Sequence, residues 1–233
     1  MLTAVVVLAL GGSNPSPTPP LRREGLQTIG APGYVSGRAE GPAPPPFLGE
    51  GVGGRGSALA PPPRPAPLRA TAADGAPFVW PPAAPGKAAC LVFVGTDCPL
   101  ANAYAPEINR LVAGYGPKGV TFAVVYPLPD LAAGAVQKHA KEYGFACPAL
   151  PDRELRVAKR VGATTTPEAV VLSPAGDVLY RGRIDDRYPK AGGRRRENPT
   201  TFDLRDALDA ALAGRTAPKP WPPAVGCHID FPD

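Results

Sequence analysis

An uninterrupted apolar segment that stops just before a Cys-Pro pair constrains this chain more than any other feature. Residues 88–94 are apolar, Gly95 ends the run, and Cys98 stands directly before Pro99 and a stretch with helical spacing. An apolar run without alternation is typical of a strand covered on both faces, and proline is favoured at the first position of a helix. The sequence therefore predicts a buried strand that delivers a cysteine to a helix N-terminus.

The same kind of patterning continues on both sides of this segment. The expected elements are, in order, a hairpin over 68–80, a strand over 88–94, a helix over 99–115, a strand over 119–125, helices over 131–143 and 153–161, a hairpin over 168–181 and a helix over 202–213. Asp130, Asp152 and Thr201 are expected to cap the last three helices. Strand, helix and strand in succession imply a right-handed parallel crossover, so the fold class is α/β.

Cys98 is the candidate nucleophile, because the unpaired N–H groups and the dipole of a helix N-terminus favour a thiolate. Free cysteines have a pKa near ~8.5, and cysteines at such positions commonly have values of about 3.5–7.5. Asp97 acts in the opposite direction, since a neighbouring carboxylate disfavours a second negative charge. We expect a moderately activated thiol here, although burial as a small apolar residue is the commoner fate of a free cysteine.

Several short motifs lie between Phe93 and Ile229: Cys98-Pro99, Tyr104-Ala105-Pro106-Glu107, Thr166-Pro167-Glu168, the segment 180–186 and Gly226-Cys227. Together they resemble the redoxin-domain proteins of bacterial exported type, within the thioredoxin-like superfamily (the alkyl hydroperoxide reductase and thiol-specific antioxidant-like group). The resemblance implies a thioredoxin-like fold, a central mixed sheet flanked by helices. It also implies a thiol-disulfide oxidoreductase acting on protein or small-molecule thiols and disulfides. Thr166 and Pro167 should form a cis peptide beside Cys98 and complete the catalytic site.

The chain departs from the superfamily at Ala101, which stands where a resolving cysteine belongs in Cys-x-x-Cys. Release of a mixed disulfide needs a second thiol, and the candidates are Cys227, Cys147 or an external donor. Cys90 lies inside the apolar strand and is interpreted as a core residue. We expect Cys227 to be the partner, because it lies in a Gly-Cys tail without a strong reason to be buried.

Two other functions remain open from the sequence. The missing second cysteine favours a redox-inactive binding module that holds a partner along the Thr166-Pro167 loop. A one-cysteine peroxiredoxin-like peroxidase is the other alternative, although Leu91 and Gly95 occupy the proline and threonine positions of the Pro-x-x-x-Thr-x-x-Cys pattern.

The sequence indicates no cofactor, no metal centre and no nucleic-acid surface. The four cysteines lack paired Cys-x-x-Cys spacing, and His228 beside Cys227 supplies at most half of a metal site. The net charge is +5, but the basic run over 190–196 has almost no aromatic residues around it. Such a run predicts a solvated loop rather than a nucleic-acid interface.

Composition divides the chain into four parts. Residues 1–12 contain the apolar stretch Leu2–Leu10, which resembles a secretory signal or membrane-targeting segment but lacks a positively charged start. Residues 13–67 are rich in proline and glycine and are expected to form a disordered linker. Residues 68–215 are expected to form the thioredoxin-like domain, and residues 216–233 an extended tail. We therefore expect an exported protein of the periplasm or cell envelope, which the N-terminus could tether to the membrane. A cytoplasmic location is the alternative.

Overall fold

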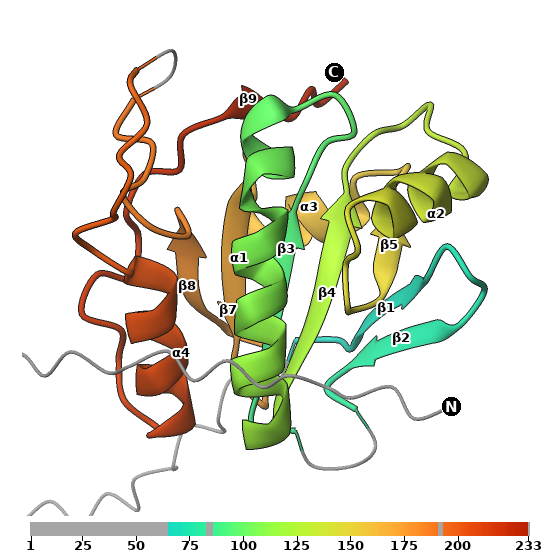
Figure 1. Ribbon diagram of the computed structural model, residues 1–233. Helices are drawn as coiled ribbons and strands as arrows, with labels where there is room; N and C mark the ends of the chain where they lie inside the picture. Colours follow the sequence, from blue (N-terminus) through green and yellow to red (C-terminus); the bar gives the residue numbers. More distant parts are fainter. Residues whose placement is uncertain (1–64, 83–85, 191–192, 233) are drawn as a thin grey trace, which may run out of the picture. The chain divides into compact units, whose positions relative to one another are not determined.

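The computed structural model describes residues 65–82, 86–190 and 193–232. Within them lies a five-stranded sheet of order β5-β4-β3-β7-β8 (Figure 1). Its strands are β3 (Ala88–Phe93), β4 (Val120–Tyr126), β5 (Ala149–Pro151), β7 (Glu168–Leu172) and β8 (Val178–Gly182). β3 pairs in parallel with β4 and antiparallel with β7, so the sheet is mixed. The predicted α/β class with a central mixed sheet is confirmed.

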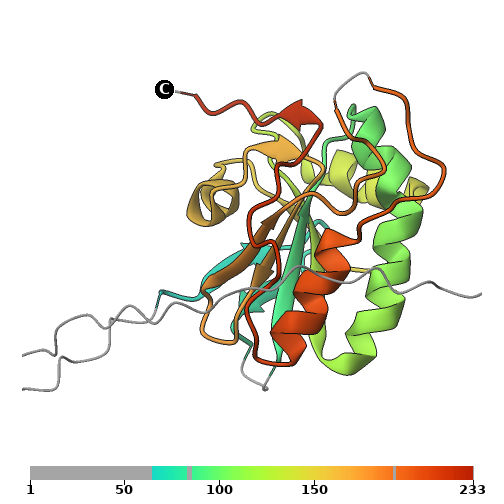
Figure 2. The ribbon, with the colours of Figure 1, turned by 90° about the vertical axis from the view of Figure 1, so that its left-hand side faces the viewer.

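Helices cover both faces of this sheet. They are α1 (Pro99–Tyr115), α2 (Ala133–Glu142), α3 (Arg156–Val161) and α4 (Asp203–Leu212), with a short 3-10 helix η1 (Gly116–Lys118) after α1. α1 and α4 pack on one face and α3 on the other, as Figure 1 and Figure 2 show together. The sheet is therefore the middle layer of three, and α1 crosses β3 directly after the Cys-Pro pair.

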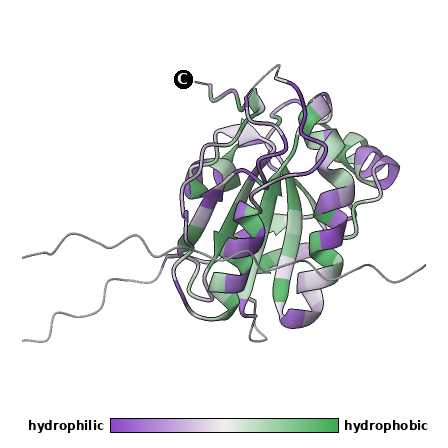
Figure 3. Cartoon of the chain, turned by 60° about the vertical axis from the view of Figure 1, so that its left-hand side comes forward, coloured by the Kyte–Doolittle hydropathy of each residue, from purple (hydrophilic) through white to green (hydrophobic). Residues whose placement is uncertain are grey.

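β3 is apolar along its whole length because it faces a core on each side. Cys90 and Val92 belong to the core under α1 and α4, whereas Leu91 and Phe93 belong to the core under α3. All of its residues are buried. Hydrophobic colouring accordingly gathers on the inner strands, and the helices carry hydrophilic colour on parts of their surfaces (Figure 3). The predicted two-sided burial of this strand is confirmed.

A separate hairpin packs on the α3 side. β1 (Leu68–Thr71) and β2 (Pro77–Trp80) pair antiparallel, and Gly75 adopts a φ of 89° in the turn between them. The Trp80 indole N–H donates a hydrogen bond of 2.8 Å to the Ser173 carbonyl and is fully buried. The hairpins predicted over 68–80 and 168–181 are both present.

The three predicted helix caps are wrong. α2 has Ala132 at its N-cap position with no side-chain hydrogen bond, so Asp130 does not cap it. The Thr201 hydroxyl donates to the Asp203 carboxylate at 3.0 Å instead of accepting a bond from a backbone N–H of α4, whose N-cap is Phe202. A polar residue before a helical pattern indicates a cap only where the backbone turns at that residue.

Asp152 misses the cap position but still holds the start of α3. That helix begins at Arg156, because Leu155 takes a left-handed conformation with a φ of 56°. The Asp152 carboxylate accepts hydrogen bonds from the N–H groups of Val157 at 3.1 Å and Ala158 at 2.8 Å. Asp152 therefore binds the N–H groups at the start of α3 from a position further before the helix than an N-cap residue.

The C-terminal tail forms one more strand. β9 (Cys227–His228) pairs antiparallel with β6 (Thr165–Thr166), with Thr166 opposite Cys227 and Thr165 opposite His228. Figure 2 shows the tail leaving α4 and running back toward this edge. The sequence indicated an extended segment here but not a strand.

The predicted signal or membrane-targeting segment (residues 1–12) and residues 13–64 of the predicted linker lie outside the described residues. Among the helices that the structure does describe, none has the length and apolar character needed to cross a bilayer.

Candidate functional site

The candidate site lies where β3 ends and α1 begins. Cys98 is the N-cap residue of α1, with extended backbone angles (φ −91°, ψ 104°) and Pro99 as the first helical residue. Its carbonyl accepts the first helical bond, from the Asn102 N–H at 3.1 Å. The prediction that a buried strand delivers Cys98 to a helix N-terminus is confirmed, and the side chain is only 3% exposed.

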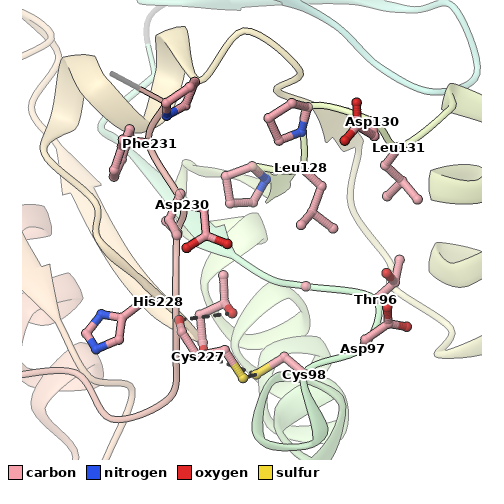
Figure 4. A pocket seen from close by; sticks show the side chains of 16 residues that line it. Thr96, Asp97, Cys98, Leu128, Asp130, Leu131, Cys227, His228, Asp230 and Phe231 are labelled. Carbon is pink, nitrogen blue, oxygen red and sulfur yellow. Dashed lines mark hydrogen bonds between the residues drawn. The ribbon is translucent and has the colours of Figure 1, made fainter.

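Three chain segments meet at the Cys98 sulfur. The Cys98 thiol donates a hydrogen bond of 3.1 Å to the Thr166 carbonyl, and the Cys227 Sγ lies 3.0 Å from the Cys98 Sγ (Figure 4). The peptide bond between Thr166 and Pro167 is cis. Residues far apart in the sequence are thus brought together, and Cys227 is among them.

Hydrogen bonds set the acidity of the two thiols in opposite directions. Burial alone would raise the pKa of Cys98, but hydrogen bonds from the Cys227 thiol, the Ala101 N–H and the Thr166 side chain lower it overall. The hydrogen bond to Cys98, together with burial, raises the pKa of Cys227 to about 11. The pair therefore loses its first proton from Cys98, while Cys227 keeps its own.

A buried chain of hydrogen bonds supports the loop before Cys98. The Asn102 amide donates to the Thr96 carbonyl at 3.0 Å, and its oxygen lies 3.1 Å from His139 Nε2. The Tyr126 hydroxyl lies 3.0 Å from His139 Nδ1. Burial lowers the pKa of His139, and a neutral ring that donates from Nε2 and accepts at Nδ1 satisfies every group in this chain.

Sequence reasoning missed this chain of contacts. The available signal was Asn102, a polar residue one turn after Cys98 in a helix whose neighbouring positions are largely apolar. Its partners come from α2 and β4, so only the packed fold identifies them.

Cys147 and Cys90 are not at this site. Cys147 lies just before β5, is partly buried, and burial raises its pKa to about 12. Cys90 is fully buried in β3, and its pKa is raised by that burial. The expected core role of Cys90 is what the structure shows, and Cys147 packs against the same core and does not line the cavity beside Cys98.

A cavity of about 740 Å³ opens beside the two sulfurs. Its walls are residues 95–98 after β3, residues 127–131 after β4, Thr166, and residues 227–232 of the tail (Figure 4). Carboxylates of Asp97, Asp130 and Asp230 interrupt a largely apolar lining. A cavity of this size accepts a small molecule or the side chains of a short peptide segment.

Residues 57–192 match the family model described as Redoxin. The chain belongs to the redoxin family. Its fold is thioredoxin-like, in agreement with the resemblance that the Cys-Pro, Thr-Pro and Gly-Cys motifs indicated.

Individual relatives of this redoxin chain carry further information. The thiol-disulfide oxidoreductase ResA of Halalkalibacterium halodurans is 30% identical over 95 residues, which cover 40% of this chain and 52% of ResA. The chain thus spans about half the length of the curated relative that it matches.

Two solved structures share the fold. An uncharacterized conserved protein from Geobacillus kaustophilus has 30% identity and a TM-score of 0.60, and the match covers 72% of this chain and 89% of that one. A hypothetical protein from Sinorhizobium meliloti 1021 has 25% identity and a TM-score of 0.62, with coverage of 72% and 93%.

The Asp185-Asp186 motif of this redoxin chain has a structural role. Asp185 accepts a hydrogen bond of 2.5 Å from the Tyr104 hydroxyl. Asp186 is held by the Thr200 N–H at 2.7 Å and pairs with Arg196 at 2.8 Å. Burial works against the charge, but these hydrogen bonds lower the pKa of Asp186 to about 2. The motif therefore fastens the loop between β8 and α4.

Within residues 65–82, 86–190 and 193–232, no cluster of three or more His, Cys, Asp or Glu side chains is arranged to hold a metal ion.

Proposed function

We propose that this redoxin is a thiol-disulfide oxidoreductase whose redox centre is the pair Cys98 and Cys227. The observation that carries the proposal is the distance of 3.0 Å between two sulfurs that are 129 residues apart in the sequence. A disulfide bond is about 2.05 Å long, so a small movement of the tail closes it. Cys227 takes the role that Ala101 cannot fill.

The chemistry proposed for the pair is reversible exchange with an external disulfide. One protein thiolate attacks the substrate disulfide, a mixed disulfide forms, and the first substrate thiolate leaves and takes up a proton. The second protein thiol then attacks the mixed disulfide, so the second substrate thiolate leaves and the Cys98–Cys227 bond forms. Two electrons pass to the substrate, and a dithiol reductant restores the pair. The reverse sequence oxidises a dithiol substrate.

Thr166 and Pro167 complete the proposed site. The Thr166 carbonyl accepts a hydrogen bond from the Cys98 thiol, and the Thr166 side chain supports the thiolate. Pro167 follows at the cis bond and has no N–H that would compete for the sulfur. The substrate would be a protein or small-molecule thiol or disulfide, since the pair itself carries the electrons and no cofactor is required.

Disulfide mapping tests this function. The full chain is equilibrated in glutathione redox buffers, quenched by acid and alkylation, and its disulfides are mapped by mass spectrometry. We expect a Cys98–Cys227 bond in the wild type and in a Cys147→Ser control. Free thiols at both positions under oxidising conditions would favour the binding module, and a Cys98–Cys147 bond would contradict the assignment of the partner.

We also propose the domain organisation and location that the sequence predicts. Residues 68–215 would form the thioredoxin-like domain, residues 13–67 a linker, and residues 1–12 an export or tethering segment supported by the apolar stretch Leu2–Leu10. Limited proteolysis should leave a stable fragment that starts near residue 68. Cleavage inside β3 or β4 before such a fragment accumulates would contradict these boundaries.

A further inference from the structure

The two sulfurs of the proposed pair differ in how far they can be reached. Cys98 is 3% exposed, whereas Cys227 lies on an exposed strand. An external thiol or disulfide must contact one of these sulfurs first. Which one it contacts decides the order of events at the site, and this inference rests on the function proposed above.

Protein groups contact Cys98 closely, although it shares the wall of the cavity with Cys227. The Thr166 carbonyl lies 3.1 Å from the Cys98 sulfur, and the Ala101 N–H points at it from α1. Gly95 is so close that a β-carbon there would lie 3.4 Å from the Cys98 Cβ. The Cys227 sulfur lies 3.0 Å from the Cys98 sulfur, and these contacts leave Cys98 only 3% exposed.

The tail is fastened in this covering position. A β-carbon on Gly226 would lie 1.9 Å from the Thr166 carbonyl oxygen, so only glycine allows this close approach. The Ile229 N–H donates a hydrogen bond of 2.9 Å to the Thr164 carbonyl, and the Ile229 side chain is 7% exposed. Contacts on both sides of Cys227 thus hold its sulfur against the Cys98 sulfur (Figure 4).

Thiol-disulfide exchange requires the attacking sulfur, the attacked sulfur and the leaving sulfur to lie close to one line, and its rate depends on which sulfur is accessible. In the closed pair, attack on Cys98 would have to come from the side opposite Cys227, and Cys98 is only 3% exposed. Attack on Cys227 comes from the exposed side. We propose that external thiols and disulfides exchange at Cys227, and that Cys98 reacts only with Cys227.

The reduction of a substrate disulfide then proceeds in two balanced steps. Cys227 attacks one substrate sulfur while its proton passes to the Cys98 thiolate, and the first substrate thiolate leaves. Cys98 then loses that proton to solvent and attacks the Cys227 sulfur, so the second substrate thiolate leaves and the Cys98–Cys227 bond forms. Cys98 acts first as a base and then as the internal nucleophile.

The reverse direction uses the same sulfurs. An external thiolate attacks Cys227 in the closed disulfide, and Cys98 leaves as a thiolate. The lowered pKa of Cys98 suits it to this role, because a thiol of lower pKa leaves faster. A second external thiolate then attacks the outer sulfur of the mixed disulfide and frees Cys227, which takes up a proton.

Trapping in the wild-type chain tests the assignment directly. The oxidised full-length protein is treated with 2-mercaptoethanol, quenched within milliseconds to seconds with acid and an alkylating reagent, and mapped by mass spectrometry. We expect the mixed disulfide on Cys227 and the alkyl group on Cys98. The opposite labelling would overturn the inference. A chain that forms no Cys98–Cys227 disulfide would instead overturn the proposed function, so the two failures are distinguishable.

Variants that lack one of the two paired cysteines give a second readout. The rate of mixed-disulfide formation with 2-hydroxyethyl disulfide is measured across pH and extrapolated to the fully ionised thiol. We expect Cys98 in a Cys227→Ser chain to react at least about tenfold more slowly than Cys227 in a Cys98→Ser chain, since access limits exchange. Equal rates, or faster reaction at Cys98, would count against the proposal.

The tail is responsible for this difference if it covers Cys98. Adding Gly226→Val to the Cys227→Ser chain should raise the rate at Cys98 by about tenfold or more. Gly114→Ala, where a β-carbon meets no atom within 4 Å, is the matched control and should leave the rate unchanged. Far-ultraviolet circular dichroism verifies folding, and Ile229→Ser is the substitute if the valine variant does not fold. A folded, released tail with Cys98 still slow would contradict the proposal.

Discussion

Cys90 and Cys98 are similarly buried, but they differ in the hydrogen-bond donors around their sulfurs. Cys90 is 0% exposed and Cys98 only 3% exposed, so both are buried. Burial raises the pKa of Cys90, yet the pKa of Cys98 is lowered. Cys90 lies within a strand whose N–H groups are engaged in the sheet, whereas Cys98 lies one turn beyond the strand end, among unpaired helix N–H groups. Whether a cysteine lies within a strand or at the helix start beyond it therefore decides whether its thiol pKa is raised or lowered.

Their nearest cysteine neighbours differ in the same way. Cys227 donates a hydrogen bond to Cys98 and is reachable from solvent. Cys147 is enclosed with Cys90, and burial raises its pKa to about 12. Cys227 lies against Cys98 as the proposed redox partner, whereas Cys147 packs with Cys90 against the core.

Replacing Cys227 or Cys147, one at a time, should give the largest difference in disulfide formation between the two environments. Cys227→Ser should abolish the intramolecular disulfide completely, because no other thiol lies against Cys98. Cys147→Ser should leave it intact. Non-reducing gels with thiol counting after oxidation measure both. An internal disulfide that persists in the Cys227→Ser chain would remove the distinction.

Release of the tail should weaken the pair without removing either thiol. In Gly226→Val, the added side chain must move away from the Thr166 carbonyl, so Cys227 loses its fixed place. The effective concentration of Cys227 at Cys98 should fall by at least about tenfold, because a tethered but undocked group samples a larger volume. Equilibration with glutathione gives this value, and Gly114→Ala serves again as the control.

Alkaline pH should reveal the inert environment. The pKa of Cys147 is raised from 9.0 to about 12 in the folded chain. Above pH 9 the folded chain therefore keeps a proton that the unfolded chain loses. The resulting contribution to the free energy of unfolding is complete below pH 9 and is lost as the pH rises toward 12. Between pH 8 and 10 the reduced wild type should therefore lose about 1 kcal/mol more unfolding free energy than Cys147→Ala. Urea denaturation in the presence of a phosphine reductant measures the difference. Ala146→Ser, an exposed neighbour, should follow the wild type.

The smallest effect concerns the support beneath the reactive pair. Asn102→Leu removes the hydrogen bond to the Thr96 carbonyl and should slow formation of the Cys98–Cys227 disulfide about fivefold, which corresponds to one hydrogen bond of about 1 kcal/mol. Asn109→Leu is the matched control, since Asn109 lies on the same helix and bonds the Gly144 carbonyl instead. Equal slowing in both variants would indicate loss of stability rather than of positioning.

Long, strongly patterned elements were predictable, and very short ones were not. The seven residues of β4 and the fully buried β3 carry enough apolar pattern to be recognised. β5 has three residues and β9 has two, too few for any period, and both owe their conformation to the strands that they pair with.

The site was predictable to a similar extent. Cys98 carries a local signal because Pro99 and Gly95 mark its place between strand and helix. Excluding the buried cysteines predicted that Cys227 lies near Cys98, and the family resemblance predicted the same of Thr166 and Pro167. His139 carries no local signal, because its role depends on the approach of α2 to the loop before α1. The caps failed for the same reason, since backbone conformation around Leu155 depends on tertiary packing.

With the proposed Cys98–Cys227 bond, the strand pairing of β6 with β9 would couple the redox state of the chain to its thermodynamic stability. A bond between Cys98 and Cys227 would close a loop of 129 residues, which contains most of the domain from α1 onward. Closing a loop of that size restricts the unfolded chain by about 4–5 kcal/mol. Folding and oxidation then form a thermodynamic cycle. The free energy by which the bond stabilises the folded chain therefore equals the free energy by which folding makes the bond harder to reduce. A variant that loosens the tail would therefore be both easier to unfold when oxidised and easier to reduce, by the same free energy.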